Sequence, residues 1–275
     1  MSSPAPLAIL AGGGTLPGRL AAARRASGGQ VLVVAFSGIT DPAGVADHEH
    51  VWLKLGQIQA MHDAIHRFGA REVVMAGPVR RPALSSLALD RRASGMLLRA
   101  GRRAFGDDGL LSVIVEELER DGLTVIGLDE VMTGVLAPSG HMAGPEPGPE
   151  GSADIRRGLE VLRLMGAGDV GQCVAVQHGI VLALEAIEGT DAMIARAGPL
   201  RRPGRGPVLV KASKPGQERR VDLPTVGVRT LEAAAAAGFS GIAIEAGGTV
   251  LLDREKVIAA ATASGLFLVG VDPVR

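Results

Sequence analysis

The chain has 275 residues, enough for one large domain or two ordinary ones with full hydrophobic cores. Its 29 basic and 29 acidic residues balance, and only 2% of its residues are aromatic, so it lacks the positive charge and the stacking side chains of a general nucleic-acid-binding protein. The single cysteine, Cys173, excludes an intramolecular disulfide framework and a multi-cysteine metal site.

The apolar runs of the sequence are shorter than a membrane span, and the run at residues 7–11 is too short for the core of a signal peptide. A single cysteine also fits a reducing compartment. We therefore expect a cytoplasmic protein, which could still contact a membrane surface peripherally.

The first half of the chain alternates short apolar runs with segments of helical periodicity. Strands are predicted at residues 7–11, 31–36, 72–76 and 123–128, with helices at 17–26, 57–68 and 110–120. Apolar strands that alternate with helices pair in parallel. We therefore predict an α/β domain with a parallel sheet over residues 1–137.

A glycine turn, Gly12 to Gly14, follows the first predicted strand and precedes a helix. Backbone N–H groups at such a turn suit a phosphate. However, Pro17 takes the place of the third glycine of the dinucleotide fingerprint, and no acid ends the second strand to bind a ribose. NAD is therefore not expected. An anion-binding turn and a plain turn capped by Thr15 both remain open.

Residues 137–151 are dominated by Gly and Pro and have no apolar period. We interpret residues 138–152 as a linker between two domains, with one long surface loop as the alternative. The second domain, residues 153–275, is predicted to be mixed α+β. It contains helices at 153–165, 230–237 and 253–264 and strands at 173–177, 180–186, 208–210, 242–245, 250–252 and 266–271, with a hairpin turn at His178-Gly179.

The histidines show no metal-ligand pattern. His62 and His66 are spaced i, i+4, but neither an intervening Glu nor a third ligand is evident, so we interpret them as a solvated helix face. Cys173 lies in an apolar strand and is interpreted as core. Four arginines in loops after predicted sheet elements are either solvated or line the edge of a cleft: Arg80, Arg81, Arg102 and Arg103.

The segment from Lys211 to Gly227 is the most informative part of the chain. Four basic residues precede its one aspartate, Asp222, and they are Lys211, Lys214, Arg219 and Arg220. Lys and Arg neutralise phosphate oxygens, and a carboxylate holds a divalent metal or a water. We interpret the segment as a site for a phosphorylated substrate, with a structural salt bridge as the alternative.

Thr190 and Asp191 follow a predicted strand and begin a helix. Helix capping is one explanation for both residues. In the functional interpretation, Asp191 lies beside Asp222 at one end of the same sheet, and the two carboxylates bind one divalent ion. The sequence leaves both interpretations open.

Motifs of the first half at residues 10–14, 76–82 and 106–108, and more specific ones of the second half at 169–172, 185–193, 211–215, 217–218, 220–227 and 270–273, give the chain a resemblance to the UDP-2,3-diacylglucosamine pyrophosphatases of the LpxI type. The likeness covers nearly the full length and is weakest at residues 143–151. It implies a Rossmann-like parallel-sheet domain followed by a mixed α+β domain, with the ligand held between them, in a homodimer with possible peripheral contact to the inner membrane.

The resemblance also implies an activity. UDP-2,3-diacylglucosamine is expected to be hydrolysed, with Mg²⁺, to UMP and 2,3-diacylglucosamine 1-phosphate (lipid X) in lipid A biosynthesis. Water is expected to attack the β-phosphorus. The family's essential aspartate falls on Asp222, expected to be a base or a metal ligand. The expected substrate contacts are Lys211, Lys214, Gln217, Arg219, Arg220, Thr190, Gly12, Gly13, Gly14 and Gly77.

Two other classes of function stay open from the residues alone. One is a Rossmann-type nucleotide-sugar oxidoreductase, which the glycine turn favours and Pro17 opposes. The other is a non-catalytic lipid-nucleotide-binding regulator of a membrane enzyme, which would bind the lipid nucleotide and release no UMP.

Overall fold

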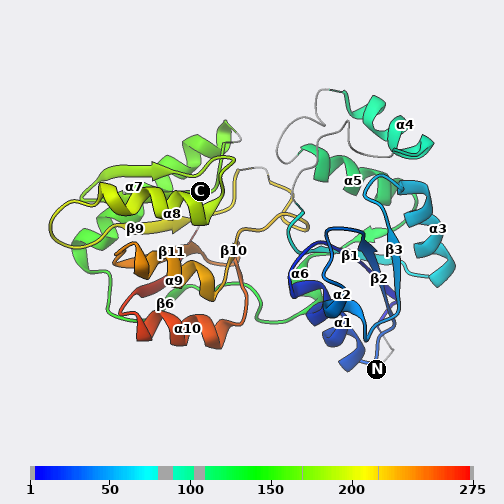
Figure 1. The fold of residues 1–275 in the computed structure, drawn as a ribbon, viewed down its shortest axis with the longest axis horizontal. Helices are drawn as coiled ribbons and strands as arrows, with labels where there is room; N and C mark the ends of the chain where they lie inside the picture. Colours follow the sequence, from blue (N-terminus) through cyan, green and yellow to red (C-terminus); the bar gives the residue numbers. More distant parts are fainter. Residues whose placement is uncertain (1–3, 80–88, 102–108, 169, 216, 273–275) are drawn as a thin grey trace. The chain divides into compact units, whose positions relative to one another are not determined.

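A computed structural model describes residues 4–79, 89–101, 109–168, 170–215 and 217–272 of the chain. These form two compact units (Figure 1). The first comprises Met1–Thr133 together with Arg220–Asp222, and the second comprises Gly134–Arg219 and Leu223–Arg275. A short piece of the second half of the sequence therefore belongs to the first unit.

The first unit is built on a five-stranded sheet whose strands are all parallel, in the order β3-β2-β1-β4-β5. Its strands are β1 (Leu7–Ala11), β2 (Val31–Phe36), β3 (His50–Leu53), β4 (Glu72–Ala76) and β5 (Thr124–Val125). The order reverses at β1, the arrangement of a Rossmann-like fold. Every residue of β1 and β2 is buried, as expected where helices cover both faces of a parallel sheet.

Six helices accompany this sheet among the described residues (Figure 1). They are α1 (Leu16–Ala26), α2 (Pro42–Val45), α3 (Ile58–Phe68), α4 (Arg91–Ala100), α5 (Gly109–Arg120) and α6 (Leu128–Val131). Ile65 of α3 and Leu118 of α5 pack with Val34 of β2 in one hydrophobic core. Helix α1 lies against β1 and β2. The parallel α/β domain predicted from the sequence is confirmed.

The second unit contains a six-stranded mixed sheet in the order β6-β13-β11-β9-β7-β8. Its strands are β6 (Gly140–Ala143), β7 (Cys173–Gln177), β8 (Ile180–Leu184), β9 (Val208–Lys211), β11 (Gly241–Glu245) and β13 (Phe267–Val271). Strands β9, β11 and β13 are parallel, whereas β7 runs antiparallel to β9 and to β8. A separate parallel pair joins β10 (Thr225–Val226) to β12 (Val250–Leu251).

Helices enclose the mixed sheet. They are α7 (Gly148–Ala167), α8 (Thr190–Ala197), α9 (Val228–Ala236) and α10 (Arg254–Ala263). Leu162 of α7 packs on Val174 and Val210, while the alternate strand residues share a core with α8, α9 and α10. At Gly158 of α7 a Cβ atom would lie 2.5 Å from the Val210 Cγ2 atom, so only glycine lets this helix approach the sheet so closely.

The predicted linker at residues 138–152 is wrong. Residues 140–143 form β6, which pairs antiparallel with β13, and α7 already begins at Gly148. Gly144 has φ +71°, and a Cβ atom there would lie 2.0 Å from the Leu266 carbonyl oxygen. Pro149 occupies the first turn of α7, where proline fits because its missing N–H has no partner in a helix. Gly and Pro here therefore serve close packing and helix initiation.

The predicted hairpin at His178-Gly179 is confirmed. Both residues have positive φ angles, 52° and 75°, and join antiparallel β7 and β8. The buried carboxylate of Asp154 on α7 accepts hydrogen bonds from the backbone N–H groups of His178 (3.1 Å) and Gly179 (2.7 Å).

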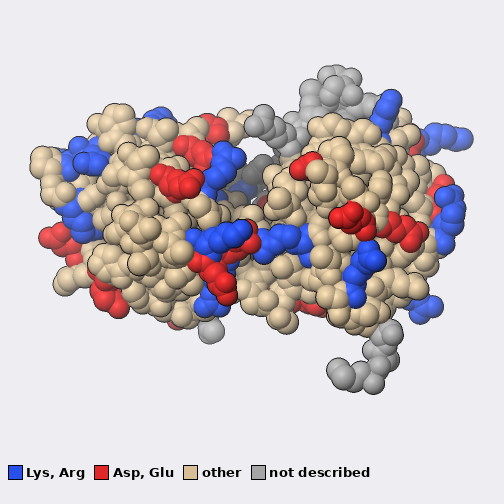
Figure 2. All heavy atoms as spheres, turned by 60° about the horizontal axis from the view of Figure 1, so that its bottom comes forward, with Lys and Arg blue, Asp and Glu red and all other residues tan. Residues whose placement is uncertain are grey.

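On the face shown in Figure 2, positive and negative side chains are interspersed among the described residues. No broad area of one sign occurs there among the described residues. In the described part of the chain, no helix combines the length and the hydrophobicity that crossing a bilayer requires.

Candidate active site

The carboxyl end of the parallel strands in the second unit gathers charged residues. Lys211 ends β9 and Glu245 ends β11, and these two strands are parallel neighbours. Glu185 follows β8, and Cys173 at the start of β7 is the register partner of Lys211. Antiparallel pairing thus brings the end of β8 and the start of β7 to the same edge. Ligands of open α/β sheets bind at this edge.

Lys211 and Glu185 are joined through Thr190, the first residue of α8. The Lys211 Nζ atom donates a hydrogen bond to Thr190 Oγ1 (2.9 Å), and that hydroxyl donates to Glu185 Oε1 (2.6 Å). Lys211 is 6% exposed and Glu185 is 7% exposed. The N-cap residue of α8 is Gly189, so Thr190 bridges two buried charges and does not cap the helix.

Glu245 anchors the loop that follows β9. It is 3% exposed, and its Oε2 atom accepts hydrogen bonds from the backbone N–H of Ser213 (2.7 Å) and from the Ser213 hydroxyl. Its Oε1 atom lies 3.7 Å from Arg219 Nη2, which also donates to the Gly247 carbonyl (2.6 Å). Glu245 therefore contacts the loop after β9 at two places, Ser213 near its start and Arg219 further along.

Lys214 and Gln217 are both buried and form a tight turn within the loop. The Gln217 side-chain oxygen accepts a hydrogen bond from the Lys214 backbone N–H (2.8 Å), and the Gln217 N–H donates to the Lys214 carbonyl (3.2 Å). The side-chain oxygen of Gln217 is thus engaged in shaping the loop. A contact between Gln217 and substrate stays a prediction.

Cys173 is fully buried at this edge. Burial raises the pKa of its thiol well above the ordinary value, and the nearby Lys211 charge only partly opposes that shift. The thiol is therefore neutral at physiological pH, and the prediction that Cys173 is a core residue is confirmed.

Arg220 and Asp222 belong to the first unit. The Arg220 Nη1 atom donates to Glu119 Oε1 of α5 (2.6 Å) and to the Val125 carbonyl of β5 (3.3 Å). Val221 packs against the core that α3 and α5 share with the sheet. Asp222 is half-buried. The chain between Lys211 and Asp222 thus supplies charged residues to both units.

Asp191 lies in the first turn of α8, where an acid is favoured by the helix dipole. Its side chain is 56% exposed, and its Oδ2 atom lies 3.2 Å from Arg229 Nη2. Because Asp191 belongs to the second unit and Asp222 to the first, joint metal binding by this pair stays a prediction.

The glycine turn of the first unit packs against the loop after β4. The N–H groups of Gly12 and Gly13 donate to the carbonyls of Ala76 (2.7 Å) and Pro78 (2.9 Å). A Cβ atom on Gly12 would lie 2.2 Å from the Gly77 carbonyl oxygen. These N–H groups are therefore used within the protein, which favours the plain turn over the anion-binding one.

The other end of this turn faces solvent. Gly14 is exposed with φ +75°, and Thr15 is the N-cap residue of α1 without a side-chain capping bond. The expected substrate contacts of Gly14 and Gly77 stay predictions. The four loop arginines Arg80, Arg81, Arg102 and Arg103 and the motif at residues 106–108 lie outside the described residues.

Glu185 and Glu245 lie at this charged edge but were not predicted from the sequence as candidate site residues. Each is an acid that directly follows a run of apolar strand residues. A charge at the end of a buried strand was the available signal, because such a position lies at the ligand-binding edge of the sheet.

A second charged cluster lies in the first unit and corrects another prediction. His62 of α3 is 1% exposed and in ion-pair contact with Asp121, which follows α5, so His62 is not part of a solvated face. Burial lowers the pKa of His62, and the nearby Arg92 charge lowers it further. A carboxylate that the helical spacing did not reveal, that of Asp121 at the end of α5, therefore lies beside His62 and His66.

Comparison with known proteins agrees with the division into two units. Residues 6–135 match the model of the LpxI N-terminal domain, and residues 138–269 match that of the LpxI C-terminal domain. The chain is 42% identical over 276 residues to the UDP-2,3-diacylglucosamine pyrophosphatase LpxI of Caulobacter vibrioides, covering 97% of this chain and 98% of that protein.

Proposed function

The chain belongs to the LpxI family, and from that membership we propose that it is a hydrolase that cleaves the pyrophosphate bond of UDP-2,3-diacylglucosamine, a step of lipid A biosynthesis. The products are UMP and 2,3-diacylglucosamine 1-phosphate. The observation that carries the proposal is the 42% identity over 97% of the chain to a pyrophosphatase of that name.

The buried cations of the second unit support this chemistry. One hydrogen of the Lys211 ammonium is used by Thr190, and among the described residues no other hydrogen-bond partner of that ammonium is found. An ammonium group has three donors. The remaining donors can contact phosphate oxygens. Fixed cations stabilise the charge that moves onto the leaving phosphate as a pyrophosphate breaks.

We assign Asp222 to the attacking water, which Asp222 orients or deprotonates as it approaches the β-phosphorus. Its half-buried carboxylate suits that role because partial burial limits competing solvation. Carboxylate oxygens are also the ligands that Mg²⁺ prefers, so Asp222 and Asp191 are the proposed residues for that ion. When bound, Mg²⁺ neutralises charge on the phosphate oxygens.

The two alternative functions have less support. A nucleotide-sugar oxidoreductase would use the glycine turn for a dinucleotide, but the N–H groups of Gly12 and Gly13 already donate to Ala76 and Pro78. A non-catalytic regulator does not fit a chain that belongs to a family of hydrolases.

We further propose that the protein is a cytoplasmic homodimer that meets its diacylated substrate at the inner membrane surface.

Incubation of the purified protein with UDP-2,3-diacylglucosamine in ¹⁸O-labelled water, with and without Mg²⁺, tests the proposal. We expect UMP release that depends on Mg²⁺ and label in the phosphate of 2,3-diacylglucosamine 1-phosphate. Label in UMP would instead mean attack on the α-phosphorus, and an absence of UMP would overturn the function itself.

The variant Asp222→Ala tests the assigned aspartate. We expect it to abolish UMP release while its circular dichroism spectrum and melting temperature stay close to those of the unmodified protein. Asp191→Ala tests the second proposed ligand of the ion. It should raise the Mg²⁺ concentration needed for half-maximal activity. Near-normal turnover by Asp222→Ala would remove Asp222 from the mechanism.

A further inference from the structure

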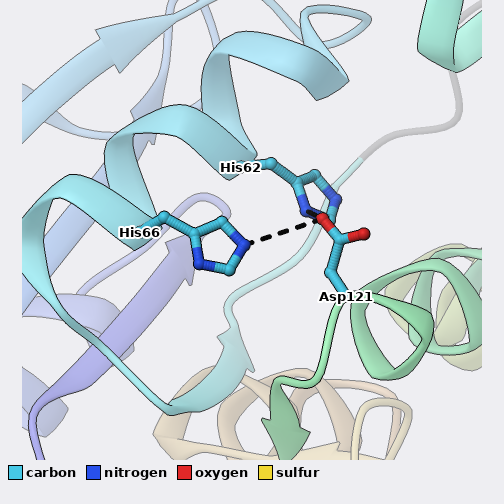
Figure 3. A group of neighbouring side chains, drawn as sticks. All are labelled: His62, His66 and Asp121. Carbon is cyan, nitrogen blue, oxygen red and sulfur yellow. Dashed lines mark ion pairs between the residues drawn. The ribbon is translucent and has the colours of Figure 1, made fainter.

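Three side chains with metal-binding atoms meet where α3 lies beside the end of α5 (Figure 3). His62 and His66 lie one turn apart on the same face of α3, and Asp121 directly follows α5. One ligand atom from each residue lies within 4.8 Å of the other two. Two histidines at i, i+4 with a carboxylate opposite them form a common ligand set for transition metals.

Asp121 is held so that one oxygen faces the imidazoles. Its Oδ2 atom is in ion-pair contact with His62 Nδ1 and lies 3.7 Å from His66 Nε2. Its other oxygen, Oδ1, lies 2.5 Å from Arg92 Nη2. When another residue binds the second oxygen of a carboxylate, the first oxygen is held in an orientation that can bind a metal.

The burial of the three residues is graded. The His62 side chain is 1% exposed, and neither of its ring nitrogens makes a well-formed hydrogen bond in the described structure. Buried polar atoms need partners, which a metal ion would supply at one of these nitrogens. The His66 side chain is 51% exposed, so an ion can enter from solvent on that side.

The charges around the cluster limit which ion can bind. The Arg92 guanidinium repels any cation, but its Nε atom is bound to Glu117 Oε1 (2.9 Å), which offsets part of its charge. Mg²⁺ prefers oxygen ligands and binds imidazole poorly. Zn²⁺ binds imidazole nitrogens and carboxylate oxygens together in sites with three protein ligands.

We propose that His62, His66 and Asp121 form a binding site for a divalent transition metal, best matched by Zn²⁺, that links α3 to the end of α5. The site is separate from the Mg²⁺ that the proposed hydrolysis requires, because two of its three donors are nitrogen atoms. Its bound ion adds a cross-link to the first unit and stabilises the folded protein by mass action.

Zinc binding to the full-length protein, after removal of metals with a chelator, tests the proposal. A competition titration against a chromophoric chelator should show one Zn²⁺ site, which millimolar Mg²⁺ does not occupy. We expect Zn²⁺ to raise the melting temperature. His66→Ala should weaken zinc binding by more than about tenfold. Even the loss of a residue that only supports a metal ligand typically weakens binding by that factor. Because His66 is exposed, this variant should fold normally.

The matched control is His50→Ala, which removes an exposed histidine of the same unit that lies outside the cluster. It should leave both zinc affinity and the zinc-dependent melting temperature unchanged. Asp121→Asn keeps the shape of the side chain but removes its charge, and it should also weaken binding. Equal zinc affinity in the unmodified protein and His66→Ala, or no binding at all, would overturn the site.

Discussion

At the scale of single residues, short hydroxyl side chains organise the charges of the second unit. Thr190 stands between Lys211 and Glu185, and Ser213 is held by Glu245. Burying these charges would be unfavourable without such hydrogen bonds. At this edge of the sheet Thr190 therefore links buried charges of opposite sign and keeps the Lys211 ammonium in place.

Thr190→Val tests this role of a single hydroxyl. The substitution preserves the shape of the side chain but leaves the Lys211 ammonium and one Glu185 oxygen without their shared partner. We expect a loss of about 1–3 kcal/mol in the free energy of unfolding, the cost of an unsatisfied buried group, measured by urea denaturation. UMP release should also fall, because Lys211 loses its fixed position.

Thr190→Ser is the matched control, since it retains the hydroxyl and removes only the methyl group. It should restore most of the stability and activity lost in Thr190→Val. If the two variants behave alike, the methyl group and not the hydroxyl matters, and the hydrogen-bonded bridge is not what positions Lys211.

The sequence predicts some of the candidate site residues and not others, and the difference has a physical reason. The basic residues and Asp222 stand out because they crowd one Pro- and Gly-containing loop. Glu185 and Glu245 do not, since their importance comes from strand pairing between distant segments. The interpretation of His62 failed for the same reason. The face of α3 that is buried depends on where α5 packs, and helical spacing alone does not reveal that.

At the scale of elements, a buried acid connects α4 to α5. Glu117 of α5 is bound by Arg92 (2.9 Å) and Arg99 (2.6 Å) of α4 and by Arg120 of its own helix. Burial acts to raise the pKa of the Glu117 carboxyl, but the hydrogen bonds from Arg92 and Arg99 outweigh it, so the pKa lies below its ordinary value. The carboxylate is thus more acidic in the folded protein than in the unfolded chain.

This shift predicts how stability depends on pH. A carboxyl whose pKa is lowered by folding stabilises the protein above its unfolded pKa, which is about 4.3 for Glu, and that contribution is lost as the pH falls through the folded pKa. The free energy of unfolding should therefore decrease from about pH 5 downward. In Glu117→Gln, which cannot titrate, urea denaturation should show a smaller decrease over the same range.

Other carboxyls titrate in this window, so the comparison must include a matched acid. Glu49→Gln provides it, because Glu49 is an acid of the same unit whose side chain is exposed. That variant should keep the pH dependence of the unmodified protein. If Glu117→Gln loses as much stability on acidification as the unmodified protein, the arginines do not stabilise the ionised carboxylate.

The sequence predicted strands best where an unbroken run of apolar residues indicates a buried strand. Strands β1, β2 and β4 are runs of apolar residues and were predicted at their observed bounds. Strand β3 was missed because it is an edge strand with alternating exposure, and β6 was missed because it lies among glycines and prolines. Pairing of β6 with β13 joins residues more than a hundred positions apart, which no local pattern reveals.

At the scale of the whole molecule, the order of the sequence and the division into units do not coincide. The first unit contains the chain up to Thr133 and, in addition, Arg220–Asp222 from the second half of the sequence. Val221 contributes to the core of the first unit, and Arg220 binds Glu119 on its surface. The first unit is therefore completed by residues that are translated long after the rest of it.

Val221→Ala tests whether this returning segment stabilises the first unit. Removing two methyl groups from a half-buried side chain should cost about 1 kcal/mol, less than the full burial of those groups would give. Hydrogen exchange measured by mass spectrometry should show faster exchange in α5 and β5. Peptides from the six-stranded sheet of the second unit should exchange at their original rates, because local openings follow contiguous packing.

Val181→Ala is the matched control, since Val181 is a half-buried valine that packs in the second unit. Its exchange pattern should be the reverse, with faster exchange at β7 and β8 and no change in α5. The comparison separates a local loss of packing from a general loss of stability, because both variants remove the same atoms. Faster exchange throughout the chain in Val221→Ala would mean that the two units unfold together, and no change in α5 would mean that the returning segment contributes nothing to the first unit.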